Sequence, residues 1–281
     1  MSESSHSVVL EKKNENFWEE PCGTISLRKN NFENREQFDS WYLNFYPYLG
    51  AYIPFQSLAG KSLAGNQVLE IGLGMGTVSE KLAEKSGSYL GMDVADAPVS
   101  LVAQRLNEKK LSGDTVKGNV LTYPFPQNFY DNIISIGCLH HTGNFELALR
   151  QVIGALKPGG NAIIMVYNAF SYRQWLFSPL DTFKRWITSG KDYKPHNADA
   201  GERFKYDSNS QGESAPFTEF LSSKQIRALL SSYKIEPKIR SENIGSKFFF
   251  PIPRKIKLKL FGPWLGLDLY VQFQKPITSD S

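Results

Sequence analysis

The chain has 281 residues, and its 32 basic against 28 acidic residues leave a formal net charge of +4. That charge is too small to indicate a nucleic-acid partner, and two cysteines indicate a reducing compartment rather than a disulfide framework. The polar start of the chain lacks the apolar core of a signal peptide, and no apolar run reaches transmembrane length, so we expect a cytoplasmic protein without integral membrane association.

Residues 1–60 are predicted to form an N-terminal tail and an aromatic helical extension of a main domain at 61–281. We expect the first ~15 residues to be frayed because they are polar and mixed in charge, and we expect a helix over 39–52 with Pro47 as a point of bending. The many aromatic residues here either pack that helix against a sheet or form a lid over a bound molecule. Those that we expect in a pocket are Trp18, Tyr42 and Tyr46.

The stretch from Val68 to Gly76, Val-Leu-Glu-Ile-Gly-Leu-Gly-Met-Gly, is the most informative part of the chain. Its first residues predict a strand buried on both faces, and its three glycines predict a turn whose backbone passes close to a ligand. A helix is predicted over 75–85 and a second strand over 89–92, which ends at Asp93. A carboxylate at that place can accept both hydroxyl hydrogens of a ribose. A dinucleotide fingerprint would need its third glycine at Thr77, one residue later than here.

Strands and helices then alternate as far as Tyr167, which predicts a parallel sheet. The predicted strands are 115–118, 131–136 and 162–167. One helix is predicted over 97–110, and a second is capped by Asn144 and ends at Lys157-Pro158-Gly159-Gly160.

The pattern Glu70-x-Gly-x-Gly-x-Gly, Asp93, and the run Cys-Leu-His-His-Thr followed by Ala-Leu-Lys-Pro-Gly-Gly resemble the class I S-adenosylmethionine (SAM) methyltransferases. The resemblance covers roughly 67–167 and is to the ubiquinone/menaquinone-biosynthesis type and its small-molecule relatives. It implies SAM as cofactor and a Rossmann-like α/β fold, with a seven-stranded, mostly parallel sheet, an antiparallel last strand and helices on both faces. Asn119 stands where the family usually has an acid. The residues expected to bind the cofactor are Glu70, Gly72, Gly74, Gly76, Asp93, Asn119, Val120, Gly137 and Cys138.

Residues 168–217 are predicted to be an insertion that caps the acceptor, because insertions at the carboxyl ends of the strands lie where ligands bind in α/β sheets. We expect helical pieces over 170–186, interrupted at Pro179, and a loop over 190–212. The alternative is a surface excursion without substrate contact. The polar residues expected nearest the strand end are Tyr167, Asn168, Tyr172 and Arg173.

Beyond the cap, a helix is predicted from Thr218, or in a shorter version from Ser222 or Ser223, followed by strands over 233–239 and 267–274. Between the strands, residues 248–261 alternate basic with apolar residues. This segment predicts either peripheral contact with an anionic membrane or a lipid-like acceptor, or a solvated charged edge with a buried face, which we favour.

The resemblance implies a SAM-dependent methyltransferase whose acceptor is a small or lipid-like molecule, most often methylated at oxygen. Carbon or nitrogen of a quinone-like or other secondary metabolite stays open, as does a SAM-binding enzyme with different chemistry. A hydroxyl acceptor calls for a base, and His140 at the end of the fourth strand is the candidate. His141 is expected in the substrate pocket, or bonded to backbone at the helix start. The histidines and cysteines show no metal-ligand spacing, so we predict no metal site.

Overall fold

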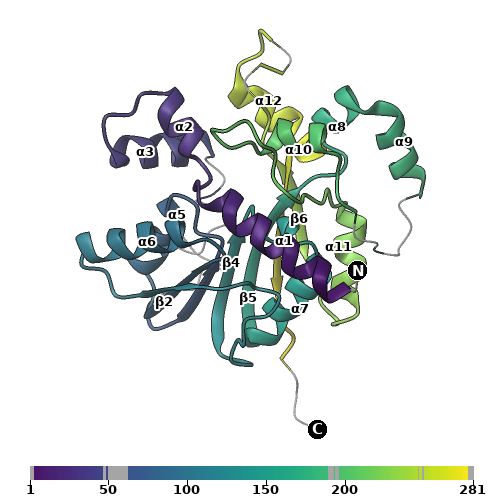
Figure 1. Cartoon of the computed structure of the whole chain (residues 1–281). Helices are drawn as coiled ribbons and strands as arrows, with labels where there is room; N and C mark the ends of the chain where they lie inside the picture. The colour runs from purple at the N-terminus through teal and green to yellow at the C-terminus, as the bar shows by residue number, and fades with distance from the viewer. Residues whose placement is uncertain are drawn as a thin grey trace.

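The structure is a computed structural model that describes residues 3–46, 49, 63–188, 193, 196–245, 247–248 and 250–277 (Figure 1). Its centre is a seven-stranded sheet in the order β3-β2-β1-β4-β5-β7-β6. The strands are β1 Gln67–Ile71, β2 Ser88–Asp93, β3 Asp114–Lys117, β4 Tyr130–Ile136, β5 Leu156–Tyr167, β6 Lys238–Glu242 and β7 Asp268–Gln274. β7 runs antiparallel to both β5 and β6, and the other described pairs are parallel. This confirms the Rossmann-like α/β fold and the antiparallel last strand.

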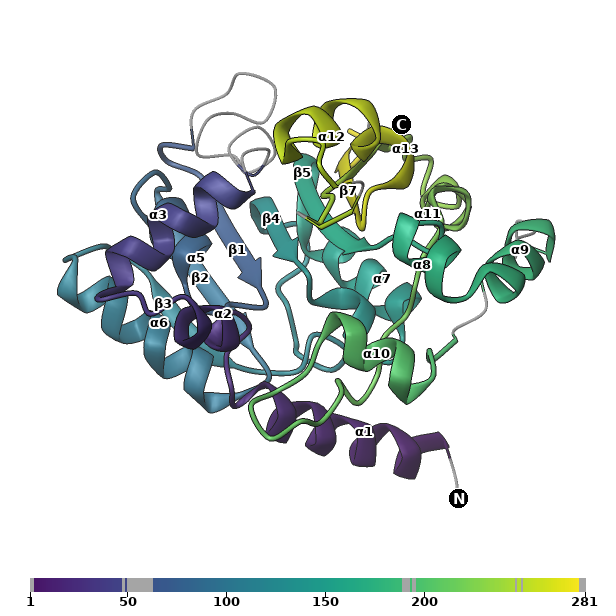
Figure 2. The same cartoon turned by 90° about the horizontal axis from the view of Figure 1, so that it is seen from above.

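Helices cover both faces of the sheet (Figure 2). Helices α5 Thr77–Ala83 and α6 Asp96–Glu108 contribute to one apolar cluster, and α7 Phe145–Ala155 and α11 Ser223–Ser231 to the other. Side chains alternate along β4, so the buried Ile133 packs in the cluster with α7 while its buried neighbour Ile134 packs in the cluster with α5. Helix α7 starts as predicted, because the Asn144 side chain accepts a hydrogen bond from the Leu147 amide at 2.9 Å.

The N-terminal region differs from the prediction. Residues that we expected to be frayed form α1 Glu3–Trp18. The carboxylate of Glu19, just after α1, accepts hydrogen bonds from the Asp96 and Ala97 amides at 2.9 and 3.0 Å, and so caps the start of α6. Polar contacts therefore hold α1 on the domain, although the polar composition of this segment had predicted a frayed terminus.

Helices α2 Thr24–Lys29 and α3 Arg35–Phe45 follow. α3 begins before the predicted residue 39 because the Asn34 side chain accepts from the Gln37 amide at 2.9 Å. Pro47 and the domain boundary near residue 60 lie outside the described residues. The buried Arg105 guanidinium of α6 fixes α3 to the domain, since it pairs with Asp39 of α3 and with Glu80 of α5 at 2.9 Å.

In the cap, α8 Tyr172–Phe177 and α9 Pro179–Thr188 confirm the predicted helical pieces around Pro179. The expected loop over 190–212 was wrong in part, because it contains α10 Ala200–Tyr206. Asp199 caps α10 by accepting from the Glu202 amide at 2.9 Å. An Asp followed three residues later by Glu is a helix-start signal that the prediction missed.

The C-terminal third shifts several predicted boundaries. Helix α11 starts at Ser223, with a capping box between Ser222 and Gln225, so the start at Thr218 was wrong and the shorter version is confirmed. β6 begins at Lys238 rather than 233, after a turn in which Lys234 has a positive φ of 57°. The segment predicted to alternate contains α12 Arg254–Leu260 and α13 Gly262–Leu265. β5 starts at Leu156, directly after α7.

Within the described ranges, no helix combines the length and apolar character needed to cross a membrane.

Candidate functional site

A glycine turn joins β1 to α5, and Gly72, Gly74 and Gly76 all have positive φ there (87°, 49° and 76°). A Cβ at Gly72 would lie 2.4 Å from the Cβ of Cys138, in the turn after β4, so only glycine allows the two turns to approach this closely. All three glycines line one large cavity, as do Gly137 and Cys138. At these three positions the turn thus presents backbone without a side chain to that space.

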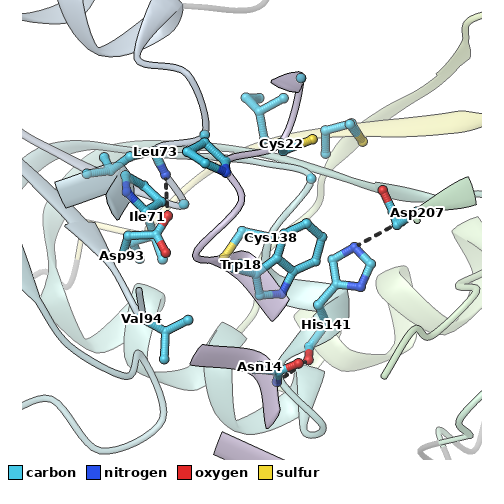
Figure 3. A pocket seen from close by; sticks show the side chains of 18 of the residues that line it. Asn14, Trp18, Cys22, Ile71, Leu73, Asp93, Val94, Cys138, His141 and Asp207 are labelled. Atoms are coloured by element: carbon cyan, nitrogen blue, oxygen red, sulfur yellow. Dashed lines mark hydrogen bonds and ion pairs between the residues drawn. The ribbon is translucent and has the colours of Figure 1, made fainter. Parts of the chain in front are cut away.

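Asp93 ends β2 and lines the same cavity. Its two carboxylate oxygens accept hydrogen bonds from the Leu73 amide at 2.8 Å and the Ala95 amide at 3.1 Å. Burial raises the pKa of Asp93 above its ordinary value, against the effect of these amides. The carboxylate is therefore fixed at the edge where the sequence placed a sugar ligand (Figure 3).

Glu70 lies on β1 beneath the glycine turn, is buried, and accepts a hydrogen bond from the Tyr89 hydroxyl at 2.5 Å. Burial raises the pKa of Glu70 to about 7. Because Glu70 also lines the cavity, a cationic ligand group beside it would favour the ionised carboxylate.

Asn119 and Val120 line the cavity after β3. The Asn119 side-chain oxygen already accepts a hydrogen bond from the Leu121 amide at 2.9 Å, as is common for an Asn in a local turn. That oxygen keeps a second lone pair, so a role toward a ligand stays a prediction.

The cavity has a volume of about 1160 Å³, larger than the roughly 300–1,000 Å³ typical of a site for one small ligand. The structure brings six of the predicted pocket residues onto its wall: Trp18, Tyr42, Tyr46, His141, Tyr167 and Arg173. It therefore has room for a cofactor along the glycine turn and a second molecule against the aromatic side.

Two predicted pocket residues do not line it. Asn168 is buried, and its side chain donates to the Gly266 carbonyl at 2.9 Å, so it joins the strand end to the segment before β7. Tyr172 packs its ring 4.0 Å from that of Phe248, and its hydroxyl accepts from the Gly245 amide at 3.1 Å. Both side chains serve the fold of the cap.

His140, our candidate base, is also not on the cavity wall. Its side chain is fully buried against Tyr167, with ring centroids 4.3 Å apart, and burial lowers its pKa far below the ordinary value. Its two ring nitrogens find no hydrogen-bond partner among the residues that the structure describes. The imidazole that reaches the cavity is the next one, His141.

His141 forms a polar group with Asp207 and Tyr167. Its Nδ1 lies 2.8 Å from the Phe217 carbonyl oxygen, and since a carbonyl only accepts, Nδ1 carries the hydrogen. Nε2 faces Asp207 Oδ2 at 3.6 Å, and the Tyr167 hydroxyl donates to Asp207 Oδ1 at 3.0 Å. Burial lowers the pKa of His141 and raises that of Asp207. A neutral imidazole thus presents its lone pair at Nε2, beside a carboxyl group.

Two residues of helix α1, Asn14 and Trp18, lie beside His141 (Figure 3). The Trp18 ring is 5.0 Å from that of His141, and the Asn14 side chain donates to the His141 carbonyl oxygen at 2.9 Å. The Ser210 amide, in the loop after Asp207, donates to the Glu20 carboxylate at 3.1 Å. The start of the chain and the cap therefore close the same side of the cavity.

Sequence reasoning missed several residues on the cavity wall: Asn14, Tyr206, Asp207, Asn243 and Asp268. Asp268 is opposite Tyr167 in the β5–β7 ladder, and burial raises its pKa to about 7. Its position as the one acid in the strand, at the strand's first residue, was the available signal. Asp207 follows α10, which the prediction treated as loop.

Comparison with known proteins agrees with this geometry. Residues 68–160 match a family model described as a methyltransferase domain. The uncharacterized methyltransferase YdaC of Bacillus subtilis (strain 168) is 33% identical over 102 residues, covering 36% of this chain and 55% of that protein. The ubiquinone/menaquinone biosynthesis C-methyltransferase UbiE of Azotobacter vinelandii is 30% identical over 133 residues, covering 41% and 51%. The match spans about half the length of these relatives.

Among solved structures, phosphoethanolamine N-methyltransferase 2 of Haemonchus contortus, in complex with phosphomonomethylethanolamine and S-adenosylhomocysteine, superposes with a TM-score of 0.55. The identity is 15%, and the match covers 84% of this chain and 53% of that one. At this identity the likeness supports the fold.

Proposed function

We propose that this chain, a class I SAM-dependent methyltransferase with SAM as its cofactor, transfers a methyl group to a hydroxyl oxygen of a small-molecule or lipid-like acceptor. One observation carries the proposal. A single cavity is lined by the glycine turn and Asp93 on one side and by the His141–Asp207 pair on the other.

The cofactor is proposed to lie along the glycine turn. Glu70 would orient the methionine ammonium group, Asp93 the ribose hydroxyls, and Asn119 with Val120 the adenine. Backbone at Gly137 and Cys138 would lie beneath the sulfur. When bound, SAM supplies a methyl group on a positively charged sulfur.

His141 is proposed as the base in place of His140. Its neutral Nε2 can take the proton of an acceptor hydroxyl, because Nδ1–H is held by the Phe217 carbonyl oxygen. Asp207 at 3.6 Å would stabilise the imidazolium that results, and the Tyr167 hydroxyl fixes Asp207 in place. The cover formed by α1 and the cap would exclude water from this step.

The acceptor would lie between the aromatic wall and His141. Trp18, Tyr42, Tyr46 and Tyr167 offer flat apolar surface, whereas Arg173, Asp207 and Asp268 add a few charged groups. An aromatic wall with a few charged groups beside it suits a hydrophobic acceptor that carries hydroxyl groups.

The test is transfer of a ¹³C-labelled methyl group from SAM to a cell extract, followed by NMR of the product. The chemical shift of the transferred carbon distinguishes an oxygen-bound methyl from one on nitrogen or carbon. An oxygen-bound methyl, lost in His141→Gln, supports the proposal. A methyl on carbon or nitrogen refutes the oxygen acceptor, and SAM binding without transfer favours an enzyme of different chemistry.

A further inference from the structure

The segment between β6 and β7 turns apolar side chains outward. Ile256 and Leu260 lie four residues apart on α12, a spacing that places them on one face of that helix. Ile252, just before α12, and Trp264, in α13, are exposed as well, and the exposed fractions of these four residues run from 37% to 79%. Phe250, just before them, is 87% exposed.

The inner face of α12 carries basic side chains beside the half-buried Leu258, which packs against the core. Lys257 is buried and its Nζ donates to the Phe248 carbonyl oxygen at 2.6 Å. The guanidinium of Arg254 stacks 3.9 Å from the ring centroid of Phe45 and donates to the Phe45 carbonyl oxygen at 2.7 Å. Unlike an ordinary surface helix, which buries its apolar face, α12 therefore buries a lysine and leaves Ile256 and Leu260 exposed. The predicted solvated charged edge with a buried face is confirmed in part, because Lys255 and Lys259 are exposed while Phe248, Leu258 and Phe261 pack against the core. The prediction did not include the exposed apolar side chains.

Positive charge accompanies the outward apolar side chains. Lys255 and Lys259 are exposed and each directly precedes one of them in sequence. The sequence between Glu242 and Asp268 contains five basic residues and no acidic one. Exposed apolar side chains beside lysines are typical of helices that lie in the interface of an anionic membrane.

Helices α8 and α9 also turn apolar side chains outward. Leu180, Phe183 and Ile187 of α9 are about half exposed or more, as are Leu176 and Phe177 of α8. Thr182 is the buried residue of α9, and its hydroxyl donates to the Gln174 carbonyl oxygen at 2.9 Å. Figures 1 and 2 show α8 and α9 at the same end of the molecule as α12.

We propose that this docking face, formed by the outward apolar residues of α8–α9 and α12–α13, binds an anionic lipid surface. A second copy of the chain is a poorer occupant, because symmetric pairing of α12 would bring Lys255 and Lys259 against lysines with no acid in that segment to offset them. Lipid headgroups supply the missing negative charge and the acyl region accommodates the apolar side chains.

The docking face borders the cavity. Asn243, Leu267 and Asp268, at the two ends of the β6–β7 segment, line the cavity, and so does Arg173 of α8. A docked molecule would have its cavity wall next to the bilayer. This position would let a lipid-like acceptor pass from the membrane into the cavity. That step rests on the proposed function, whereas binding of the docking face to a membrane does not.

Vesicle flotation with the full chain tests the proposal. Vesicles of phosphatidylcholine with about one-third phosphatidylglycerol should bind the protein at least about tenfold better than phosphatidylcholine alone, and salt should weaken the binding. Leu260→Ser with Trp264→Ser should lower binding to anionic vesicles at least about tenfold. Lys255→Glu with Lys259→Glu should remove the preference for anionic vesicles.

Matched controls lie far from the docking face. Ile277→Ser removes an equally exposed apolar side chain after the far end of β7, and Lys85→Glu reverses an exposed charge after α5; both should bind as the wild type does. An unchanged thermal shift with SAM in every variant verifies folding.

Absence of wild-type binding, or unchanged binding by both docking-face variants, would overturn docking. Docking would also be overturned if the wild type formed a dimer without vesicles in sedimentation velocity and Trp264→Ser made that dimer dissociate. Binding to anionic vesicles without methyl transfer would refute only the proposed function. Methyl transfer without binding to vesicles would refute only the proposed docking face.

Discussion

Replacing Asp93 by alanine tests the cofactor site most directly. A carboxylate offers about four lone-pair positions, and two of them are taken by the Leu73 and Ala95 amides. Those left match two ribose hydroxyls. Two hydrogen bonds to a charged group, at about 1.5–3 kcal/mol each, would give about 3–6 kcal/mol, and the cost of burying the carboxylate lowers the net to about 1–3 kcal/mol. We expect Asp93→Ala to raise the Kd for S-adenosylhomocysteine about 5- to 150-fold.

Isothermal titration calorimetry measures this change, well below the Tm of the variant, because the loss of two amide partners also destabilises the glycine turn by about 1–3 kcal/mol. Asp96→Ala is the matched control. Its carboxylate is exposed and pairs with Lys117 at 2.6 Å, away from the cavity wall. If Asp93→Ala and Asp96→Ala both kept wild-type affinity, the ribose placement would be refuted.

Three further predictions concern other groups. The His141 imidazole should titrate below its usual pKa in NMR spectra. His141→Gln should slow methyl transfer to a hydroxyl acceptor about 10²- to 10⁴-fold while S-adenosylhomocysteine binding persists. Equal transfer rates in the variant and the wild type would exclude His141 as the base. Burial raises the pKa of Glu219 to about 7. Between pH 4.5 and 7 the folded chain therefore keeps a proton on Glu219 that the unfolded chain has lost. The free energy of unfolding of the wild type should fall by up to about 3 kcal/mol as the pH rises through this range. Urea unfolding at pH 5 and 8 should show a smaller fall in Glu219→Gln, and an equal fall would contradict the assignment. Arg105→Met leaves Asp39 and Glu80 without their shared partner and should cost about 3–5 kcal/mol of unfolding free energy; a loss below about 1 kcal/mol would mean that the pairs are solvated.

The glycine-turn side of the cavity could be predicted because its residues lie at or directly after strand ends. Glu70, the glycines and Asp93 occur in order at the ends of β1 and β2, and parallel strands bring those ends to one edge. Pattern and spacing therefore carried spatial information there.

The acceptor side could not be predicted in the same way. Leu139–His141 forms one 3₁₀ turn, in which successive side chains point about 120° apart, so adjacent histidines face different surroundings and sequence cannot say which one meets the cavity. Asp207 reaches His141 from 66 residues further along the chain, after a short helix with weak periodicity. Helix α1 escaped prediction because contacts such as that of Asn14 with the His141 carbonyl oxygen, rather than an apolar stripe, hold it.

The contact between Gly72 and Cys138 has an evolutionary consequence. A methyl group at position 72 would require the volume now filled by the cysteine side chain, so the two positions share one space. Because Gly72 also has a φ of 87°, a larger residue is strained there even when the side chain at position 138 is smaller. Glycine at position 72 should therefore persist among homologues, and a library should hold it fixed while varying position 138.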